Sequence, residues 1–420
     1  MREPRRGINF DSALGRQIIE LHVWAVSEGL RGVPADQLFD GFCRRLVIAG
    51  VPLWRGFTAM ETLHPQWGGY SYTWRRDLNA IEPGHFARSL YQGPSWFDSP
   101  FAYLVSQADP PAQTGHPWQH LRRRLCGAAA QLDFPVLEEL AAAGATDYFA
   151  EIVQFGADGD PSRGTGIGYS FATDRPEGFR DDDLQLLEAV LPVVSLAMMT
   201  HAGHTIAAGL LAAYLGGDPG RRVHAGAVER GSVESVHAVL WYADIRGFTA
   251  LADRTPGLAV IGLLNEVFET LTASLRPRGG QVLKFMGDAM LAIFPFADET
   301  RGEICRHALD AAAEAMQALA QLNQARRDAG KPAAAIDLAL HIGEVLYGNV
   351  GAVDRLDFTV IGSAVNEVSR IENLCEPLGH AVLVSAEFAL AAVDDGRLEP
   401  LGHHRLRGVR DPRAIYALVI

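Results

Sequence analysis

Cysteine is scarce in this chain, and its distribution limits the kinds of site that the sequence can build. The 420 residues contain no CxxC pair, so the spacing supports neither a zinc site nor a disulfide framework. The first residues, MREPRRGINFDSALG, are basic but lack an apolar run, so they do not form a secretory signal. We therefore predict reduced thiols in a cytoplasmic protein. The cysteines are Cys43, Cys126, Cys305 and Cys375.

The chain also lacks a surplus of basic residues. Its 37 lysines and arginines are outnumbered by 50 acidic residues, which gives a formal net charge of −13. A negative surface repels phosphate backbones and anionic lipids. We therefore expect neither nucleic acid nor an anionic membrane as the main partner.

Formal charge is absent from one long stretch, residues 189–217, which is long enough to span a bilayer. It contains Pro192, His201, His204 and Thr205 and is rich in alanine, so we expect no membrane span. Its residues recur instead at alternating steps of four and three, the spacing of a seam between two helices. We therefore predict a dimerising helix. The seam consists of Leu187, Leu191, Val194, Met198, His201, Thr205, Ala208, Ala212 and Leu215.

Residues 1–185 differ in composition from the rest, because they hold six of the seven tryptophans. Periodicity predicts helices over 11–29 and 36–49 and, later, a helix with an acidic first turn. Between them it predicts four strands, in PLWRGFTAM, GGYSYTWRR, TDYFAEIVQF and GTGIGYSFAT. This layout and the segment SFATDRPEGFRDDDLQLLEAV resemble a GAF-type small-molecule sensor. The resemblance implies an α/β sensor domain with an unidentified small-molecule or protein effector.

The organisation of the chain follows from these boundaries. We predict a GAF-like sensor domain over 1–185, a dimerising signalling helix and linker over 186–232, and a second domain over 233–420. In the second domain the order strand–helix–hairpin–helix–strand is a βαββαβ, ferredoxin-like arrangement. The predicted fold class is α+β.

Two aspartates mark the second domain. Asp244 ends a buried strand in WYADIRGFT, and Asp288 lies at a hairpin tip in KFMGDAMLAIF. Each residue by itself is typical of a turn. In a βαββαβ sheet, however, the first strand lies beside the hairpin, so the two carboxylates converge. Two hard oxygen ligands predict a Mg²⁺ site, where the cation relieves the repulsion between them.

The turn after the first aspartate predicts a phosphate contact. The backbone N–H groups of Gly247, Phe248 and Thr249 lie near a helix start and can donate to phosphate oxygens. The alternative interpretation is local, with Asp244 capping the turn and Gly247 relaxing the backbone.

Taken together, four motifs resemble those of a known family. WYADIRGFT, KFMGDAMLAIF, LHIGEVLYGNVG and DFTVIGSAVNEVSRIE look like the catalytic domain of class III nucleotidyl cyclases, over about residues 236–420. The resemblance implies conversion of ATP to cyclic AMP and pyrophosphate, with two Mg²⁺ or Mn²⁺ ions per active site. It also implies a head-to-tail homodimer whose active sites are built across the interface.

The resemblance assigns the metal and purine contacts. Asp244 and Asp288 correspond to the metal ligands, with the carbonyl of Ile245 completing one site. Lys284 corresponds to the lysine that reads the adenine ring. Thr359 occupies the position of the second purine reader, where threonine is typical of a bacterial and soluble subgroup of adenylyl cyclases.

The same resemblance assigns the ribose and phosphate contacts. Asn366 and Arg370 lie four residues apart on one predicted helix face, so both can reach one ligand. They correspond to the asparagine that orients the ribose and the arginine that offsets charge on the α-phosphate, and Arg407 corresponds to a residue at the terminal phosphates. In the family, the metal ligands come from one protomer and the other groups from its partner. A chain with both sets therefore predicts a homodimer.

Two alternatives stay open at this point. A catalytically silent nucleotide-binding module would have lost an aspartate or the Asn/Arg pair, and this chain keeps both. A guanylyl cyclase would favour an acceptor in place of Lys284, because guanine presents N–H donors at that edge. We therefore expect an adenylyl cyclase regulated by its N-terminal sensor.

Overall fold

The computed structural model describes residues 9–78, 80–107, 118–155, 166–392 and 396–419. Contacts divide the chain into two compact units, Met1–Leu210 and Leu211–Ile420. This division falls inside the segment 186–232 that the sequence assigns to a signalling helix and linker. The predicted borders of the three parts stay a prediction.

The N-terminal unit is built on a six-stranded antiparallel sheet with the order β3-β2-β1-β6-β5-β4. The sequence predicted β1, β2, β5 and β6. It missed the two edge strands, and β3 contains Pro83 and Gly84, which are tolerated at an edge. The strands are β1 (Arg55–Glu61), β2 (Gly69–Arg75), β3 (Ala80–Phe86), β4 (Trp118–Arg124), β5 (Asp147–Gln154) and β6 (Gly166–Thr173).

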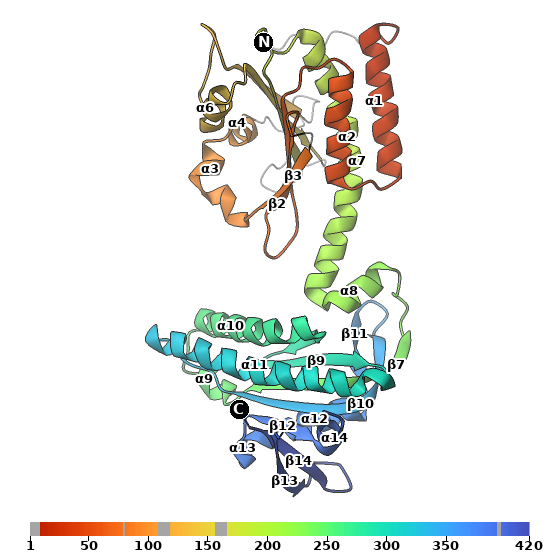
Figure 1. The fold of residues 1–420 in the computed structure, drawn as a ribbon, viewed down its shortest axis with the longest axis vertical. Coiled ribbons are helices and arrows are strands. Elements are labelled where there is room, and N and C mark those ends of the chain that lie inside the picture. The colour runs from red at the N-terminus through yellow and green to blue at the C-terminus, as the bar shows by residue number, and fades with distance from the viewer. Residues whose placement is uncertain (1–8, 79, 108–117, 156–165, 393–395, 420) are drawn as a thin grey trace. The chain divides into compact units, whose positions relative to one another are not determined.

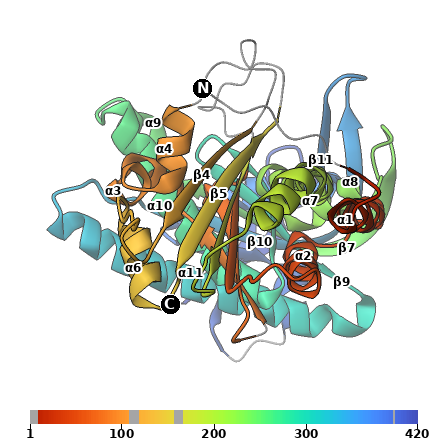
Figure 2. The same cartoon turned by 90° about the horizontal axis from the view of Figure 1, so that it is seen from above.

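Helices cover both faces of this sheet (Figures 1 and 2). On one face α1, α2 and α7 pack in a large apolar core, and on the other α4 and α6 pack in a smaller one. The mixed architecture is the one predicted for a sensor domain, while the specific likeness to GAF domains stays a prediction. The helices are α1 (Ala13–Leu30), α2 (Ala35–Ile48), α3 (Pro94–Phe97), α4 (Pro100–Ser106), α6 (Pro135–Ala142) and α7 (Asp181–Leu215).

The long helix α7 corrects part of the predicted seam. Four seam residues are fully buried in the core of the N-terminal unit. Their stripe packs against the chain's own sheet and helices, so a two-helix seam over this part of α7 is wrong. Over His201–Leu215 the seam stays a prediction. The four buried residues are Leu187, Leu191, Val194 and Met198.

Two helices in the described ranges are long and apolar enough to cross a membrane, by length and composition only. They are α7 and α10 (Gly257–Leu275), the latter with its short extension to Arg278. Half of the apolar window of α7 is buried inside the structure, as in the core helix of a globular domain. The absence of a membrane span stays a prediction.

The C-terminal unit contains an eight-stranded sheet whose centre has the order β10-β7-β9-β8. This is the order of a βαββαβ ferredoxin-like fold, and it confirms the predicted α+β class. The strands β12, β14 and β13 extend the sheet beyond β10, and β11 pairs with the end of β10. The strands are β7 (Val233–Ile245), β8 (Gln281–Met286), β9 (Ala289–Phe296), β10 (Ile336–Gly351), β11 (Leu356–Ile361), β12 (Val382–Ser385), β13 (Leu398–His404) and β14 (Arg413–Leu418).

Both faces of the central strand β7 are buried. Val239 and Trp241 pack with α10 and α11 on one face, whereas Ala238 and Leu240 pack with α12 on the other. Figure 1 shows these helices beside the sheet. By the same alternation, Asp244 lies on the α12 side. The helices are α8 (Gly217–His224), α9 (Phe248–Ala252), α10, α11 (Arg301–Asp328), α12 (Ser363–Glu372), α13 (Cys375–Leu378) and α14 (Ala386–Ala392).

The glycine directly after α7 touches the sheet of the C-terminal unit. Gly216 has a φ of 94°, in the region that favours glycine. A Cβ atom added there would lie 2.8 Å from the carbonyl oxygen of Val282 in β8. The junction is therefore packed backbone to backbone, two residues before Lys284.

Candidate active site

Asp244 and Asp288 meet at one edge of the C-terminal sheet. Asp244 lies near the end of β7, and Asp288 follows Gly287, whose φ of 69° forms the turn between β8 and β9. Pairing of Ala243 with Met290 brings the two aspartates side by side. Burial, then a hydrogen bond with Asp288 and the charge of that carboxylate, raise the pKa of Asp244 to about 6. The predicted convergence of the two carboxylates is therefore present.

This pair suits divalent cations. Oδ1 of Asp244 is buried and has no hydrogen-bond partner in the described part of the chain, which is costly for a lone acceptor. No group of three or more His, Cys, Asp and Glu side chains there is arranged to hold a metal alone. Mg²⁺ in proteins is usually held by one or two carboxylates together with water and substrate oxygens. The carbonyl of Ile245, next in β7, stays a predicted ligand.

The predicted phosphate loop follows directly. Gly247 has a φ of 67° and caps α9, whose first residues are Phe248 and Thr249. The N–H groups of a first helical turn have no acceptor within the helix. They lie at the end of β7 beside the carboxylate pair, which is where phosphates carried by a cation would be. The phosphate contact itself stays a prediction.

Lys284 is held by an acidic residue that the sequence did not single out. The pairing of β8 with β9 is irregular between Val282 and Lys284, so a simple alternation does not set the lysine's direction. Its Nζ donates to Oδ2 of Asp357 in β11 at 2.6 Å. The residues lie 73 positions apart, and the ion pair ties the hairpin to β11.

Strand β11 places the predicted purine reader beside that ion pair. Phe358 and Val360 face the core of the unit, so Asp357 and Thr359 share the opposite face. Thr359 is buried, while the side chain of Asp357 is 59% exposed. Lys284 and Thr359 thus flank Asp357 on one surface.

Helix α12 carries the predicted ribose and phosphate residues. Asn366 is exposed and Arg370 is half-buried one turn later. A Cβ atom on Gly343 of β10 would lie 2.3 Å from Cβ of Ala364, so α12 packs closely on the sheet. A Cβ atom on Gly408 would lie 3.6 Å from Nη2 of Arg370, which brings the segment with the neighbouring Arg407 to α12.

The sequence over residues 231–419 matches the family described as the Adenylate and Guanylate cyclase catalytic domain. This part of the chain belongs to the class III cyclase family. The match confirms the family that the four motifs indicated. The cyclase domain so defined contains the carboxylate pair, the phosphate loop, Lys284 and α12.

Two curated relatives are adenylate cyclases by name. Adenylate cyclase 1 of Rhizobium meliloti (strain 1021) is 29% identical over 180 residues, which cover 42% of this chain and 27% of that protein. Adenylate cyclase of Anabaena cylindrica is 32% identical over 162 residues, covering 38% of this chain and 31% of that protein. The chain thus spans less than a third of either relative, and the activity of the whole chain is a proposal.

Solved structures of cyclases also match in part. The adenylyl cyclase CyaB from P. aeruginosa is 27% identical, with a TM-score of 0.42, and covers 45% of this chain and 96% of its own. A bacterial light-regulated adenylyl cyclase is 24% identical, with a TM-score of 0.46, and covers 55% of this chain and 64% of its own.

Two further acidic residues of the cyclase domain lie at the carboxylate pair and were missed by sequence analysis. Asp337 of β10 is paired with Asp244 in the ladder and accepts from Nε of Arg246 at 2.9 Å. Burial, then the charges of Asp244, Asp337 and Asp288, raise the pKa of Glu372 to about 8. Arg246, inside the WYADIRGFT motif, was the one signal that an acidic partner was needed.

The site residues of the cyclase domain fall into three groups within one chain. Between these groups, no hydrogen bond or ion pair is present in the described ranges. The groups are Asp244 with Asp288, Lys284 with the face of β11 that carries Thr359, and Asn366 and Arg370 with the segment that carries Arg407.

Proposed function

We propose that this chain is an adenylyl cyclase that converts ATP to 3′,5′-cyclic AMP and pyrophosphate. The observation that carries the proposal is the half-buried pair Asp244 and Asp288, with one carboxylate oxygen unpartnered among the described residues, inside a class III cyclase domain. The names of the two curated relatives favour ATP as substrate.

In the proposed reaction the ribose 3′-hydroxyl oxygen bonds to the α-phosphorus. The bond from that phosphorus to the bridging oxygen of the β-phosphate breaks, pyrophosphate leaves, and the hydroxyl proton passes to water. Asp244, Asp288 and the carbonyl of Ile245 would hold two Mg²⁺ or Mn²⁺ ions, which lower the pKa of the hydroxyl and offset charge on the leaving group. The N–H groups of residues 247–249 bind the outer phosphate oxygens.

The second set of residues positions the nucleotide. Lys284 donates to N1 of adenine, and the hydroxyl of Thr359 makes the second purine contact. Asn366 orients the ribose for in-line attack, while Arg370 and Arg407 offset charge on the phosphates. Positioning and fixed charge of this kind supply most of the rate acceleration in phosphoryl transfer.

A homodimer is part of the proposal. The isologous pairing of two chains lets each give its carboxylates to one site and its purine and phosphate residues to the other. The support for this pairing is that one chain carries both sets of residues. We further propose that the N-terminal unit senses an effector in the cytoplasm and acts on the dimer through α7.

The test is turnover by the purified full-length chain with ATP or GTP and Mg²⁺ or Mn²⁺, with cyclic nucleotides measured by chromatography. Asp244→Asn should abolish product formation with the fold intact. Asp253→Asn, a change at an exposed carboxylate nearby, should not.

Each other outcome points elsewhere. A higher kcat/KM for GTP than for ATP would replace the proposal with a guanylyl cyclase. Nucleotide binding without product from either substrate would indicate a silent regulatory module. Wild-type turnover by Asp244→Asn would refute the metal assignment.

A further inference from the structure

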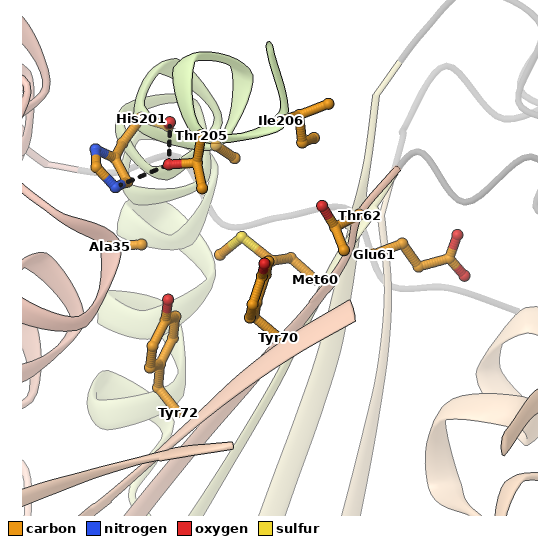
Figure 3. A pocket seen from close by; sticks show the side chains of 10 residues that line it. Ala35, Met60, Glu61, Thr62, Tyr70, Tyr72, His201, Thr205 and Ile206 are labelled. Atoms are coloured by element: carbon orange, nitrogen blue, oxygen red, sulfur yellow. Dashed lines mark hydrogen bonds between the residues drawn. The ribbon is translucent and has the colours of Figure 1, made fainter. Parts of the chain in front are cut away.

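A cavity of about 170 Å³ lies inside the N-terminal unit, apart from the cyclase residues (Figure 3). Its floor is formed by β1, β2 and the residue that follows β1. Ala35 at the start of α2 and one face of α7 form its walls. The two sides of the cavity therefore come from the rigid sheet and from the helix that leaves this unit.

Polar groups are directed into this cavity. Thr62 is only 7% exposed, and its hydroxyl lies on the cavity side, as do the hydroxyls of Tyr70 and Tyr72 (Figure 3). In the part of the chain that the structure describes, these three hydroxyls have no hydrogen-bond partner. On the opposite wall, Oγ1 of Thr205 lies 3.2 Å from Nε2 of His201. Thr62 is buried, whereas Tyr70 and Tyr72 are half-buried, so the three hydroxyls can bond to a ligand in place of water.

Carboxylates surround the cavity without entering it. The side chain of Glu61 points away from it (Figure 3), and its carboxyl interacts with Tyr91 and Arg88 instead. Asp36, on α2, adds to the effect of burial in raising the pKa of Tyr72. An anion in the cavity would meet these negative charges, and among the described residues no lysine or arginine lines the cavity to balance an ion that has lost its water. The cavity therefore suits a neutral molecule.

The volume of the cavity and its apolar walls further limit the kind of ligand that fits. Met60, Ala35, Ala202 and Ile206 supply apolar surface around the hydroxyls. An apolar protein cavity of about 150 Å³ is enough to hold benzene. A single ring with a small polar substituent fits the space and matches both kinds of wall.

We propose that this cavity binds a small neutral ring compound that carries a hydroxyl or carbonyl group, as a phenol does. The ring lies against Met60 and Ile206, and its polar group bonds to the hydroxyls of Thr62, Tyr70 and Tyr72. Occupancy restrains α7, because four residues of that helix line the cavity. The helix continues to Leu215, and Gly216 then contacts Val282, two residues before Lys284.

The binding test uses the full-length chain and phenol as the probe, followed by calorimetry or ligand-observed NMR. Saturable binding of phenol is expected, with benzoate at least about tenfold weaker. Thr62→Val, which keeps the shape and removes the hydroxyl, should weaken phenol by about threefold to tenfold. Thr73→Val is the matched control, because Thr73 lies on the other face of β2 and should change nothing.

A second variant keeps the test decisive. Ala202→Phe fills the cavity and should abolish phenol binding with the far-ultraviolet circular dichroism unchanged; if it does not fold, the Thr62 and Thr73 pair decides. No saturable binding of phenol to the wild-type chain would overturn the site. Equal binding of benzoate, or equal loss in both threonine variants, would overturn the ligand class.

The effect on catalysis rests on the proposed function, whereas the binding test does not. Phenol should change the rate of cyclic AMP formation by the wild-type chain, and Thr62→Val should shift that response to higher phenol concentration. If the rate stays constant up to saturating phenol, the proposed effect on catalysis is refuted, while the proposed binding site is not. A chain that binds phenol but makes no cyclic nucleotide would count against the cyclase proposal alone.

Discussion

The two sheets of this protein treat an aspartate beside a strand end in opposite ways. In the N-terminal sheet Asp147 is fully buried and satisfied. Its Oδ2 accepts from Nη2 of Arg122 at 2.7 Å and from the N–H of Phe179 at 3.0 Å, and its Oδ1 accepts from the N–H of Tyr148 at 3.0 Å. Both carboxylate oxygens of Asp147 therefore have partners within the chain.

In the cyclase sheet, Asp244 is less buried than Asp147 and has fewer hydrogen-bond partners. It faces Asp288, and its Oδ1 has no partner among the described residues. Folding would favour an arginine there, as it does at Asp147. The difference teaches that an acid with a cation partner serves the fold, whereas an acid paired with another acid marks a site prepared for a ligand.

The largest effect is expected from Asp288→Asn. Loss of one ligand carboxylate should lower kcat by about a thousandfold. Without divalent cations the variant should be at least as stable as the wild type, because a like-charge contact is removed. Turnover and the unfolding temperature measure the two effects, and a variant that is inactive because it is unfolded would break the comparison.

Asp147→Asn should give the reverse pattern. Removing one partner of a buried ion pair costs about 3–5 kcal/mol of unfolding free energy, measured by denaturant titration. The cyclase rate per folded molecule should hold. Asp133→Asn is the control, since Asp133 forms a half-exposed pair with Arg123 that is worth about 1 kcal/mol or less.

Asp357→Asn is expected to act on substrate binding. Without its carboxylate partner the ammonium group of Lys284 is free to leave the purine contact, so KM for ATP should rise by about tenfold with a smaller change in kcat. The unfolding temperature should stay constant, because an exposed ion pair adds little stability. Asp354→Asn, in the exposed turn before β11, serves as control. Equal KM in both variants would exclude a positioning role for Asp357.

The smallest effect is a pH dependence of stability in the metal-free protein. The pKa of Asp244 is raised from 3.8 to about 6 in the folded chain, so protonation of this carboxylate stabilises the folded state. This contribution to the free energy of unfolding is complete below pH 3.8 and is lost as the pH rises through about 6. The unfolding temperature should fall across that window, and less so in Asp244→Asn. Mg²⁺ should restore stability as pH rises, since protons and cations compete for the same carboxylate. A fall of equal size in the variant would contradict the assignment.

Sequence reasoning reached the order of the strands β10-β7-β9-β8 and the contact between Asp244 and Asp288. Long apolar runs, a hairpin with a glycine turn and two amphipathic helices fix βαββαβ from local patterns alone. The carboxylate pair followed from that order, because the first strand and the hairpin are neighbours in it. The resemblance of DFTVIGSAVNEVSRIE to the cyclase family assigned Asn366 and Arg370, and their spacing places them one turn apart on α12.

What escaped prediction depends on contacts between distant segments. Asp357 meets Lys284, and Glu372 meets the carboxylate pair, only through the packing of β11 and α12. Strand β12 is four residues long, too short for periodicity to reveal. The first part of the apolar stripe on α7 was wrongly predicted to contact a second helix. Steps of four and three are also the spacing of a helix that packs against the core of its own domain.

The glycine that follows α7 makes the length of that helix matter. Gly216 has a φ of 94°, which residues other than glycine rarely adopt, and a Cβ atom there would lie 2.8 Å from the carbonyl oxygen of Val282. One residue added to or removed from α7 would bring a different residue to this position. Its side chain would then meet the main chain of β8.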